Sequence, residues 1–305
     1  MTSTSQPLLS VIVPSFNNLA VLQRCLTSWM QYAPDAPIEI LVIEDGCRDQ
    51  TAEYLREVSE SEWGKRYLRW FHENDVGELL CNNRGFAEAR ANLMLVWQDD
   101  MFLESDKLVP ELIATFDAYT DIGLLSLSRG LNCVPIDEPI ETWEDLIDWR
   151  RLPSTIGDGP LNWFKLQEVD IVVRPWVVRR EVIQKVGVLD KAFCPHEWDE
   201  ADFCYRLRDA GWKVATHGYE RAGFFSHLGS MTIGKKPPAQ QQQLALKNGL
   251  IFHERWGTQI QSEHPKDRQT WWRRVGIAGL SAAVAQIPRF LIKSGTSTAK
   301  NEQNS

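Results

Sequence analysis

Short apolar runs alternate with stretches of helical spacing over the first 130 residues. The runs at 8–14 and 38–43 are aliphatic and rich in β-branched residues, which predicts strands buried on both faces of a parallel sheet. Residues 19–30 carry apolar side chains at helical spacing, and Asn17 or Asn18 is in position to cap a helix there. Strand, helix and strand in this order form a βαβ unit, so the pattern predicts an α/β fold.

The alternation continues to about residue 130. Further helices are predicted over 51–58, 107–119, 180–186 and 203–210, the last ending at Gly211, and further strands over 67–72, 122–126, 170–173, 212–216 and 224–227. Residues 82–92 are predicted to form a loop that leads into a short helix. Residues 131–169 show no sustained period, and an irregular stretch of this length is typical of functional or mobile segments.

One apolar run, Leu93 to Trp97, ends just before two adjacent carboxylates, Asp99 and Asp100. In open α/β sheets, ligands bind beyond the carboxyl ends of the strands. The two acids are therefore candidates for holding a cation or a sugar nucleotide. A strand-end aspartate can equally cap the following helix, and the pair alone does not separate the two interpretations.

Composition narrows the class of protein. The chain has 305 residues, of which 43% are hydrophobic and 24% charged, as in ordinary soluble globular proteins. The formal net charge of −8 argues against nucleic acid as a partner. Six cysteines without metal-site spacing indicate a reducing compartment, and the polar N-terminus lacks the features of a signal peptide. We therefore expect a cytoplasmic protein.

The last part of the chain differs from the rest. Residues 264–305 carry seven Lys or Arg against two acidic residues, a net charge of +5. A small-residue apolar run at 275–287 has aromatic and basic flanks, which suit a membrane interface. A helix packed on the preceding domain, followed by a disordered end, explains the same pattern equally well. We predict a domain boundary at 257/258, with domain 1–257 followed by the extension 258–305. If the extension lies at a membrane interface, the protein is expected to be peripheral at the inner face of the membrane.

Six motifs in a fixed order carry a resemblance to a known family. They are SVIVPSFNN at 10–18, IEDGCRD at 43–49, NRGFAEARAN at 83–92, QDD at 98–100, DEADFCYRLRDAGW at 199–212 and HLGSM at 227–231. In order and spacing they resemble the family-2 glycosyltransferases of the GT-A fold, over about residues 8–257. The resemblance implies a Rossmann-like mixed sheet flanked by helices, in a single catalytic domain with a C-terminal helical extension.

The resemblance also implies a nucleotide-diphosphate sugar donor and a divalent cation, Mg²⁺ or Mn²⁺, across its phosphates. Asp100 matches the metal-binding acid, with Asp99 as second choice, and His227 matches a late histidine that completes the metal site or touches the diphosphate. The positions that correspond to donor-binding residues are Pro14, Ser15, Phe16, Glu44, Asp45, Arg84, Arg90, Gln98 and Asp99.

Inverting transfer needs a base that takes the proton of the acceptor hydroxyl. By resemblance this base is Asp199 or Glu200, and the swapped order of the two acids leaves both open. Trp198 lies beside them and is predicted to bind the acceptor sugar, with Trp163 as a weaker choice. Asp202 and Arg206, four residues apart, are predicted to form a structural ion pair.

The expected function is transfer of a sugar to a hydroxyl of a glycan or lipid-linked glycan, in surface polysaccharide biosynthesis. One alternative is a non-catalytic protein that binds nucleotide sugars or glycans, suggested by Gln98, Glu44 and the altered base motif. A sugar nucleotidyltransferase ranks third, because residues 14–18 contain neither glycine nor a basic residue. Gly46 and Gly85 are predicted to serve turns with positive φ.

Overall fold

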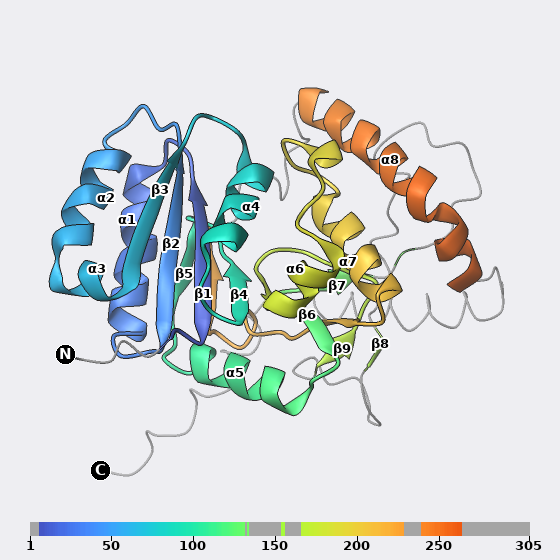
Figure 1. The fold of residues 1–305 in the computed structure, drawn as a ribbon, viewed down its shortest axis with the longest axis horizontal. Helices are drawn as coiled ribbons and strands as arrows, with labels where there is room; N and C mark the ends of the chain where they lie inside the picture. Colours follow the sequence, from blue (N-terminus) through green and yellow to red (C-terminus); the bar gives the residue numbers. More distant parts are fainter. Residues whose placement is uncertain (1–5, 132, 134–153, 156–165, 229–238, 264–305) are drawn as a thin grey trace, which may run out of the picture.

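The computed structural model describes residues 6–131, 133, 154–155, 166–228 and 239–263. Within these residues, nine strands form a mixed sheet in the order β3-β2-β1-β4-β11-β6-β12-β9-β8 (Figure 1). The strands of this sheet are β1 (Leu9–Ser15), β2 (Ile38–Asp45), β3 (Leu68–Glu73), β4 (Leu93–Val96), β6 (Ile122–Ser126), β8 (Ser154–Thr155), β9 (Gln167–Glu168), β11 (Trp176–Arg179) and β12 (Lys213–Thr216).

Two short ribbons and the helices complete the described fold. The ribbons pair β7 (Gly130–Leu131) with β10 (Ile171–Val172), and β5 (Met101–Leu103) with β13 (Phe225–His227). The α-helices are α1 (Leu19–Tyr32), α2 (Thr51–Glu60), α3 (Glu62–Tyr67), α4 (Glu78–Glu88), α5 (Leu108–Ala118), α6 (Arg180–Val186), α7 (Asp199–Asp209) and α8 (Ala239–Glu263), and a 3-10 turn covers Lys191–Phe193.

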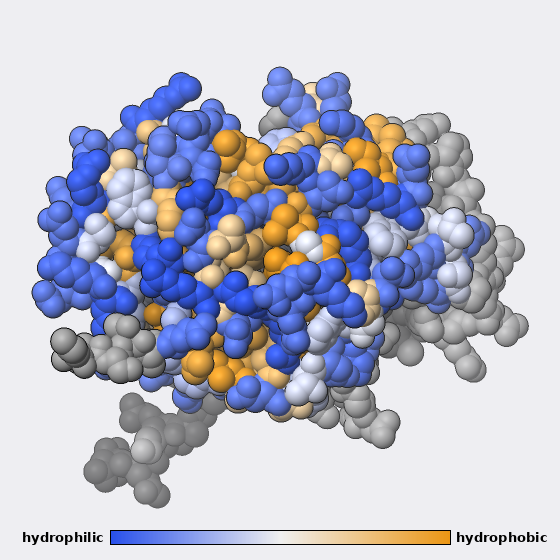
Figure 2. Space-filling view, viewed as in Figure 1, coloured by the Kyte–Doolittle hydropathy of each residue, from blue (hydrophilic) through white to orange (hydrophobic). Residues whose placement is uncertain are grey.

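The sheet separates two hydrophobic layers, as the predicted α/β fold requires. Alternate side chains of a strand point to opposite faces, so in β1 Val11 packs with α1, α2 and α5, whereas Ile12 packs with α4, α7 and α8. Strand β1 is parallel to β2 on one side and to β4 on the other. Polar residues cover most of the face shown in Figure 2, and apolar residues gather along its middle.

The structure corrects the sequence analysis at three places. Strand β11 was not predicted, although it lies in the middle of the sheet, antiparallel to both β4 and β6. Helix α4 occupies part of the segment predicted as a loop. Gly46 has the expected φ of 67°, whereas Gly85 lies inside α4, where a Cβ would come 2.2 Å from a methyl carbon of Ile12. Gly85 therefore serves close helix–strand packing and not a turn.

Helix α8 runs without a break through the predicted boundary at 257/258. Of the described residues, no helix is both long enough and apolar enough to cross a membrane. The apolar run at 275–287, its flanks, and Trp163 lie outside the described residues, as does most of 131–169.

Candidate active site

Polar side chains converge at the edge of the sheet where β1, β2 and β4 end. Ser15 Oγ donates a hydrogen bond to Asp99 Oδ2 over 2.8 Å, and Asn18 Nδ2 donates to Asp99 Oδ1 over 3.3 Å. Burial raises the pKa of Asp99 to about 6, although the two donors oppose this shift. Asn18 begins α1 as predicted, but its side chain holds Asp99 instead of capping the helix.

Asp100 and His227 meet at the same edge, although 126 residues separate them in the chain. Strand β5 begins directly after Asp100 and pairs with β13, which brings His227 opposite Met101. His227 Nε2 lies 3.1 Å from Asp100 Oδ1. This ring nitrogen is buried and makes no well-aligned hydrogen bond. The Asp100 carboxylate raises the pKa of His227. A carboxylate and an imidazole that face one another in this way can serve as adjacent ligands of a divalent cation.

These two groups would be a sparse protein ligand set. Within the described ranges, no cluster of three or more His, Cys, Asp or Glu side chains could hold a metal ion. Mg²⁺ bound through one or two protein groups completes its shell with waters and substrate phosphates. Asp100 and His227 therefore fit a cation that binds together with a diphosphate.

The two acids after β2 are already engaged. Glu44 accepts from the backbone N–H of Cys47 and contacts His72 Nδ1. Asp45 accepts hydrogen bonds from the backbone N–H groups of Val76 and Gly77, at 2.7 and 2.8 Å. Both carboxylates lie at the predicted edge, but they hold the loops there, and neither has an oxygen without a partner.

The two predicted arginines pair with acidic side chains other than Asp99 and Asp100. Arg84 pairs with Glu88 at 3.0 Å and with Glu73 at 3.8 Å, beside the edge strand β3. Arg90 lies at the opposite edge of the sheet, where its backbone N–H donates to Glu39 near the start of β2. The reason is that the chain returns along α4 to begin β4, which carries Arg90 to the amino-terminal edge. We therefore leave Arg90 out of the site.

The remaining donor positions lie at the expected edge. Phe16 is half exposed directly after β1, and its ring can meet a planar group, while Pro14 is partly buried within the strand. Gln98 Nε2 donates over 3.4 Å to Glu78 Oε1, which joins the end of β4 to the first turn of α4.

Asp199 and Glu200 begin α7, and one guanidinium connects them. Arg174 reaches Asp199 Oδ2 at 2.5 Å and Glu200 Oε2 at 3.2 Å, and Trp176 Nε1 donates to the same Glu200 oxygen over 3.2 Å. The Asp199 side chain is 1% exposed and that of Glu200 is 17% exposed. Burial raises the pKa of Glu200 to about 7, and Arg174 counteracts this rise. Of the two predicted bases, Glu200 is the more exposed to solvent.

Two other predictions concern residues of α7 and its N-cap, namely Trp198 as an acceptor-binding residue and the ion pair of Asp202 with Arg206. Trp198 packs its ring against Phe252 of α8 at 5.1 Å between centroids, and only 9% of the residue is exposed. It is therefore poorly placed as a platform for a sugar. The ion pair between Asp202 and Arg206 is confirmed, with Nε and Oδ2 2.8 Å apart.

Sequence reasoning missed three residues that organise this region. Arg174 and Glu78 surround the predicted base, and Asn248 of α8 donates to the backbone carbonyls of Phe193, His196 and Glu197, at 2.9, 2.8 and 3.1 Å. Their contacts span the sequence without a period or motif. The Arg-Pro dipeptide at 174–175 was the available signal, since it interrupts a strand-like stretch.

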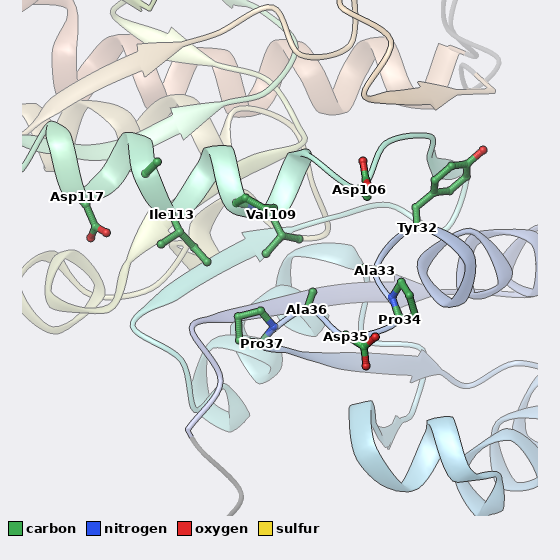
Figure 3. A pocket seen from close by; sticks show the side chains of 12 residues that line it. Tyr32, Ala33, Pro34, Asp35, Ala36, Pro37, Asp106, Val109, Ile113 and Asp117 are labelled. Carbon is green, nitrogen blue, oxygen red and sulfur yellow. The ribbon is translucent and has the colours of Figure 1, made fainter.

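A groove of about 530 Å³ lies elsewhere, between α5 and the turn that follows α1 (Figure 3). Pro34, Pro37 and Ile113 are among its lining residues, and the predicted site residues are not. The groove lies towards the amino-terminal edge of β2, so it is separate from Asp99 and Asp100 at the carboxyl edge of the sheet.

Comparison with known proteins agrees with this architecture. The sequence is 26% identical over 217 residues to a probable glycosyltransferase, YdaM, of Bacillus subtilis, covering 68% of this chain and 48% of the relative. It is 21% identical over 266 residues to the chondroitin synthase of Pasteurella multocida, covering 77% and 25% respectively. The chain thus spans about half or less of the length of these relatives.

Solved structures show the same fold at low sequence identity. The structure of GalNAc-T7 with UDP, GalNAc and Mn²⁺ matches with a TM-score of 0.63 and 16% identity, covering 84% of this chain and 50% of that one. Residues 1–349 of Staphylococcus aureus TarS match with a TM-score of 0.50 and 14% identity, covering 80% and 71%. The profile described as "Glycosyl transferase family 2" matches residues 10–187, more than half of the chain. The chain belongs to glycosyltransferase family 2 and has the GT-A fold.

Proposed function

We propose that this glycosyltransferase moves a sugar, with inversion, from a nucleotide-diphosphate donor to a hydroxyl of a glycan or lipid-linked glycan, and that it depends on Mg²⁺ or Mn²⁺. The observation that carries the proposal is the meeting of Asp100 and His227 beside Asp99 at the carboxyl edge of the sheet. A cation site and an oriented acid at this edge suit a donor whose diphosphate and ribose lie side by side.

Asp100 and His227 would hold the metal. When bound, the cation neutralises the charge that develops on the diphosphate as the glycosidic bond breaks. Asp99, fixed by Ser15 and Asn18, would accept a hydrogen bond from a donor hydroxyl. The exposed Phe16 would lie against the base.

Glu200 would act as the base. As the acceptor oxygen forms its bond to the anomeric carbon, the bond from that carbon to the donor phosphate breaks, and the hydroxyl proton passes to a Glu200 carboxylate oxygen. A base with a pKa of about 7 is ionised in about half of the molecules at neutral pH and still has a useful affinity for the proton. Attack opposite the leaving diphosphate inverts the anomeric centre.

UDP-sugars are the first donors to test. The similar structure of GalNAc-T7 contains UDP and Mn²⁺, and one relative is a chondroitin synthase. A glycan acceptor in surface polysaccharide assembly, at the cytoplasmic face, is the setting we propose. The basic tail from 264 would bring the enzyme to that membrane if it is interfacial.

The test combines turnover with metal binding. UDP release from a panel of UDP-sugars with Mn²⁺ and glycan acceptors should be detectable for the wild type and fall at least about 100-fold in Asp100→Asn. Mn²⁺ with UDP should raise the melting temperature of the wild type and not that of this variant. Asp106→Asn, which changes an exposed aspartate near the same ribbon, serves as the matched control.

Two results would contradict the proposal. Equal turnover in Asp100→Asn and in the wild type would remove the metal role. Donor-induced stabilisation without turnover with any acceptor would favour a non-catalytic protein that binds nucleotide sugars.

A further inference from the structure

A single buried guanidinium lies at the centre of an acidic cluster beside the proposed base. Arg174 contacts Glu78 at 3.3 Å, Asp199 at 2.5 Å and Glu200 at 3.2 Å. The arginine side chain is 12% exposed. Three carboxylates thus share one positive charge, and they come from the first turns of two different helices, α4 and α7.

The backbone around Arg174 is fixed to the central sheet. Ser126 Oγ donates to the carbonyl oxygen of Val173 over 2.9 Å, and the Leu127 N–H donates to the carbonyl oxygen of Pro175 over 2.9 Å. Strand β11 then begins at Trp176, between β4 and β6. The Arg174 side chain therefore extends from a backbone that is fixed in place, and its guanidinium can hold a carboxylate at a fixed position.

The charges around Glu200 act in opposite directions. Burial and the acids Asp199 and Glu78 favour its protonated form, whereas Arg174 and the hydrogen bond from Trp176 favour the carboxylate. The N-terminus of α7 adds a positive field at the same place. Arg174 is the positive side chain in direct contact with this carboxylate among the described residues.

We propose that Arg174 is a positioning residue for the transfer reaction, which fixes the Glu200 carboxylate towards the acceptor and keeps it charged, and that Glu78 balances it by competing for the same guanidinium. This inference rests on the proposed function, because it assigns Glu200 to proton transfer. Any contact with Arg174 lowers the pKa of Glu200, so a purely structural ion pair between α4 and α7 differs from a positioning role in leaving the reaction rate independent of the protonation of Glu200.

The titration of Glu200 tests this directly and needs no substrate. The side-chain carboxyl resonance of Glu200 in ¹³C-glutamate-labelled protein can be followed against pH by NMR, with Glu200→Gln identifying the signal. We expect a midpoint near the pKa of about 7 in the wild type. In Arg174→Gln it should rise by about one to three units, the effect of losing an opposite charge at this distance.

Two further variants keep the test decisive. Arg174→Lys retains the charge, so its midpoint should lie between those of the wild type and Arg174→Gln. Glu78→Gln removes a competing acid, so its midpoint should fall below that of the wild type. If Arg174→Gln does not fold, the other two variants still test the idea. Midpoints that are the same as the wild-type value would overturn it.

Activity gives a second readout. The rate of UDP release by Arg174→Gln at pH 7 should fall about 5- to 500-fold and recover as the pH rises, because the base titrates one to three units higher. A rate lowered equally at every pH would indicate a structural role only and would overturn the inference. If the wild type itself shows no turnover, the proposed function fails, whereas the NMR titration still shows whether Arg174 keeps Glu200 charged.

Discussion

Asn248 of α8 is the residue whose loss should connect stability with activity most clearly. Its side chain is fully buried, and its amide N–H groups bind three backbone carbonyls in the loop before α7. The last two residues of that loop, Glu197 and Trp198, have φ of 76° and 66°. A conformation of this kind costs about 1 kcal/mol or more per residue and persists only where the surroundings hold it. Asn248 therefore fixes the start of the helix that carries the proposed base.

The expected size follows from the bonds that are lost. One amide group provides two N–H donors, worth about 1 kcal/mol each, and a buried carbonyl left without a partner adds about 1–3 kcal/mol. Asn248→Leu should lower the free energy of unfolding by about 3–5 kcal/mol. Asn248→Ala leaves room for water and should cost less at the carbonyls. Both variants should also lose kcat, because the start of α7 is no longer fixed.

Urea denaturation followed by fluorescence measures the stability, and UDP release at saturating donor measures kcat. Gln243→Ala, at an exposed position of the same helix, is the matched control and should leave both unchanged. If Asn248→Leu kept the stability of the wild type, the hydrogen bonds would not hold the loop. If it lost stability but kept kcat in the molecules that remain folded, the loop would not position the base.

Three further predictions can be checked with the same assays. Gly85→Ala should destabilise the protein by about 1–3 kcal/mol in urea, because the new methyl group would come 2.2 Å from Ile12; equal or higher stability would mean that α4 can move. Asp202→Ala should cost about 3–5 kcal/mol, because Arg206 loses a buried partner; a loss below about 1 kcal/mol would contradict this. Wild-type activity should rise with pH through about 7 as Glu200 loses its proton, and a flat profile from pH 5 to 9 would refute its assignment as the base.

The sequence predicted much of the fold because the relevant signals are local. A buried parallel strand is a continuous apolar run, and β1 and β2 were found from such runs almost to the residue. Strand β11 was missed because it is four residues long and follows directly after the Arg-Pro dipeptide. Helix α4 was placed too late because Asn82 and Asn83 resemble a loop, although Asn82 is completely buried inside the helix.

The site was predictable only in part, for a related reason. The resemblance identified Asp100 and His227, and the pairing of β5 with β13 brings them together. The resemblance could not indicate that both carboxylate oxygens of Asp45 accept hydrogen bonds from the backbone of residues 76 and 77, because that contact spans more than thirty residues. Arg174 and Asn248 could not be predicted from the sequence for the same reason. Their partners are distant in the chain, and the side chains follow no periodic pattern.

Two ion-pair clusters on α7 differ in their balance of charge, which fits a structural role for one and the proposed catalytic role for the other. The buried carboxylate of Asp202 forms ion pairs with Arg206 and Arg255 and accepts a hydrogen bond from the indole N–H of Trp256. Its negative charge is therefore balanced by positive side chains. Such an arrangement joins α7 to α8 through charge-assisted hydrogen bonds.

Two residues earlier in the same helix the balance is reversed, since among the described residues Arg174 is the one positive side chain in contact with Glu78, Asp199 and Glu200. An excess of buried carboxylate over positive charge is costly for stability, because each unmatched acid loses its hydration. Burial, together with the neighbouring acids Asp199 and Glu78, raises the pKa of Glu200 to about 7, in the range that a base needs near neutral pH. A cluster of this kind fits the proton transfer that we propose for Glu200 better than it fits a role in stabilising the fold.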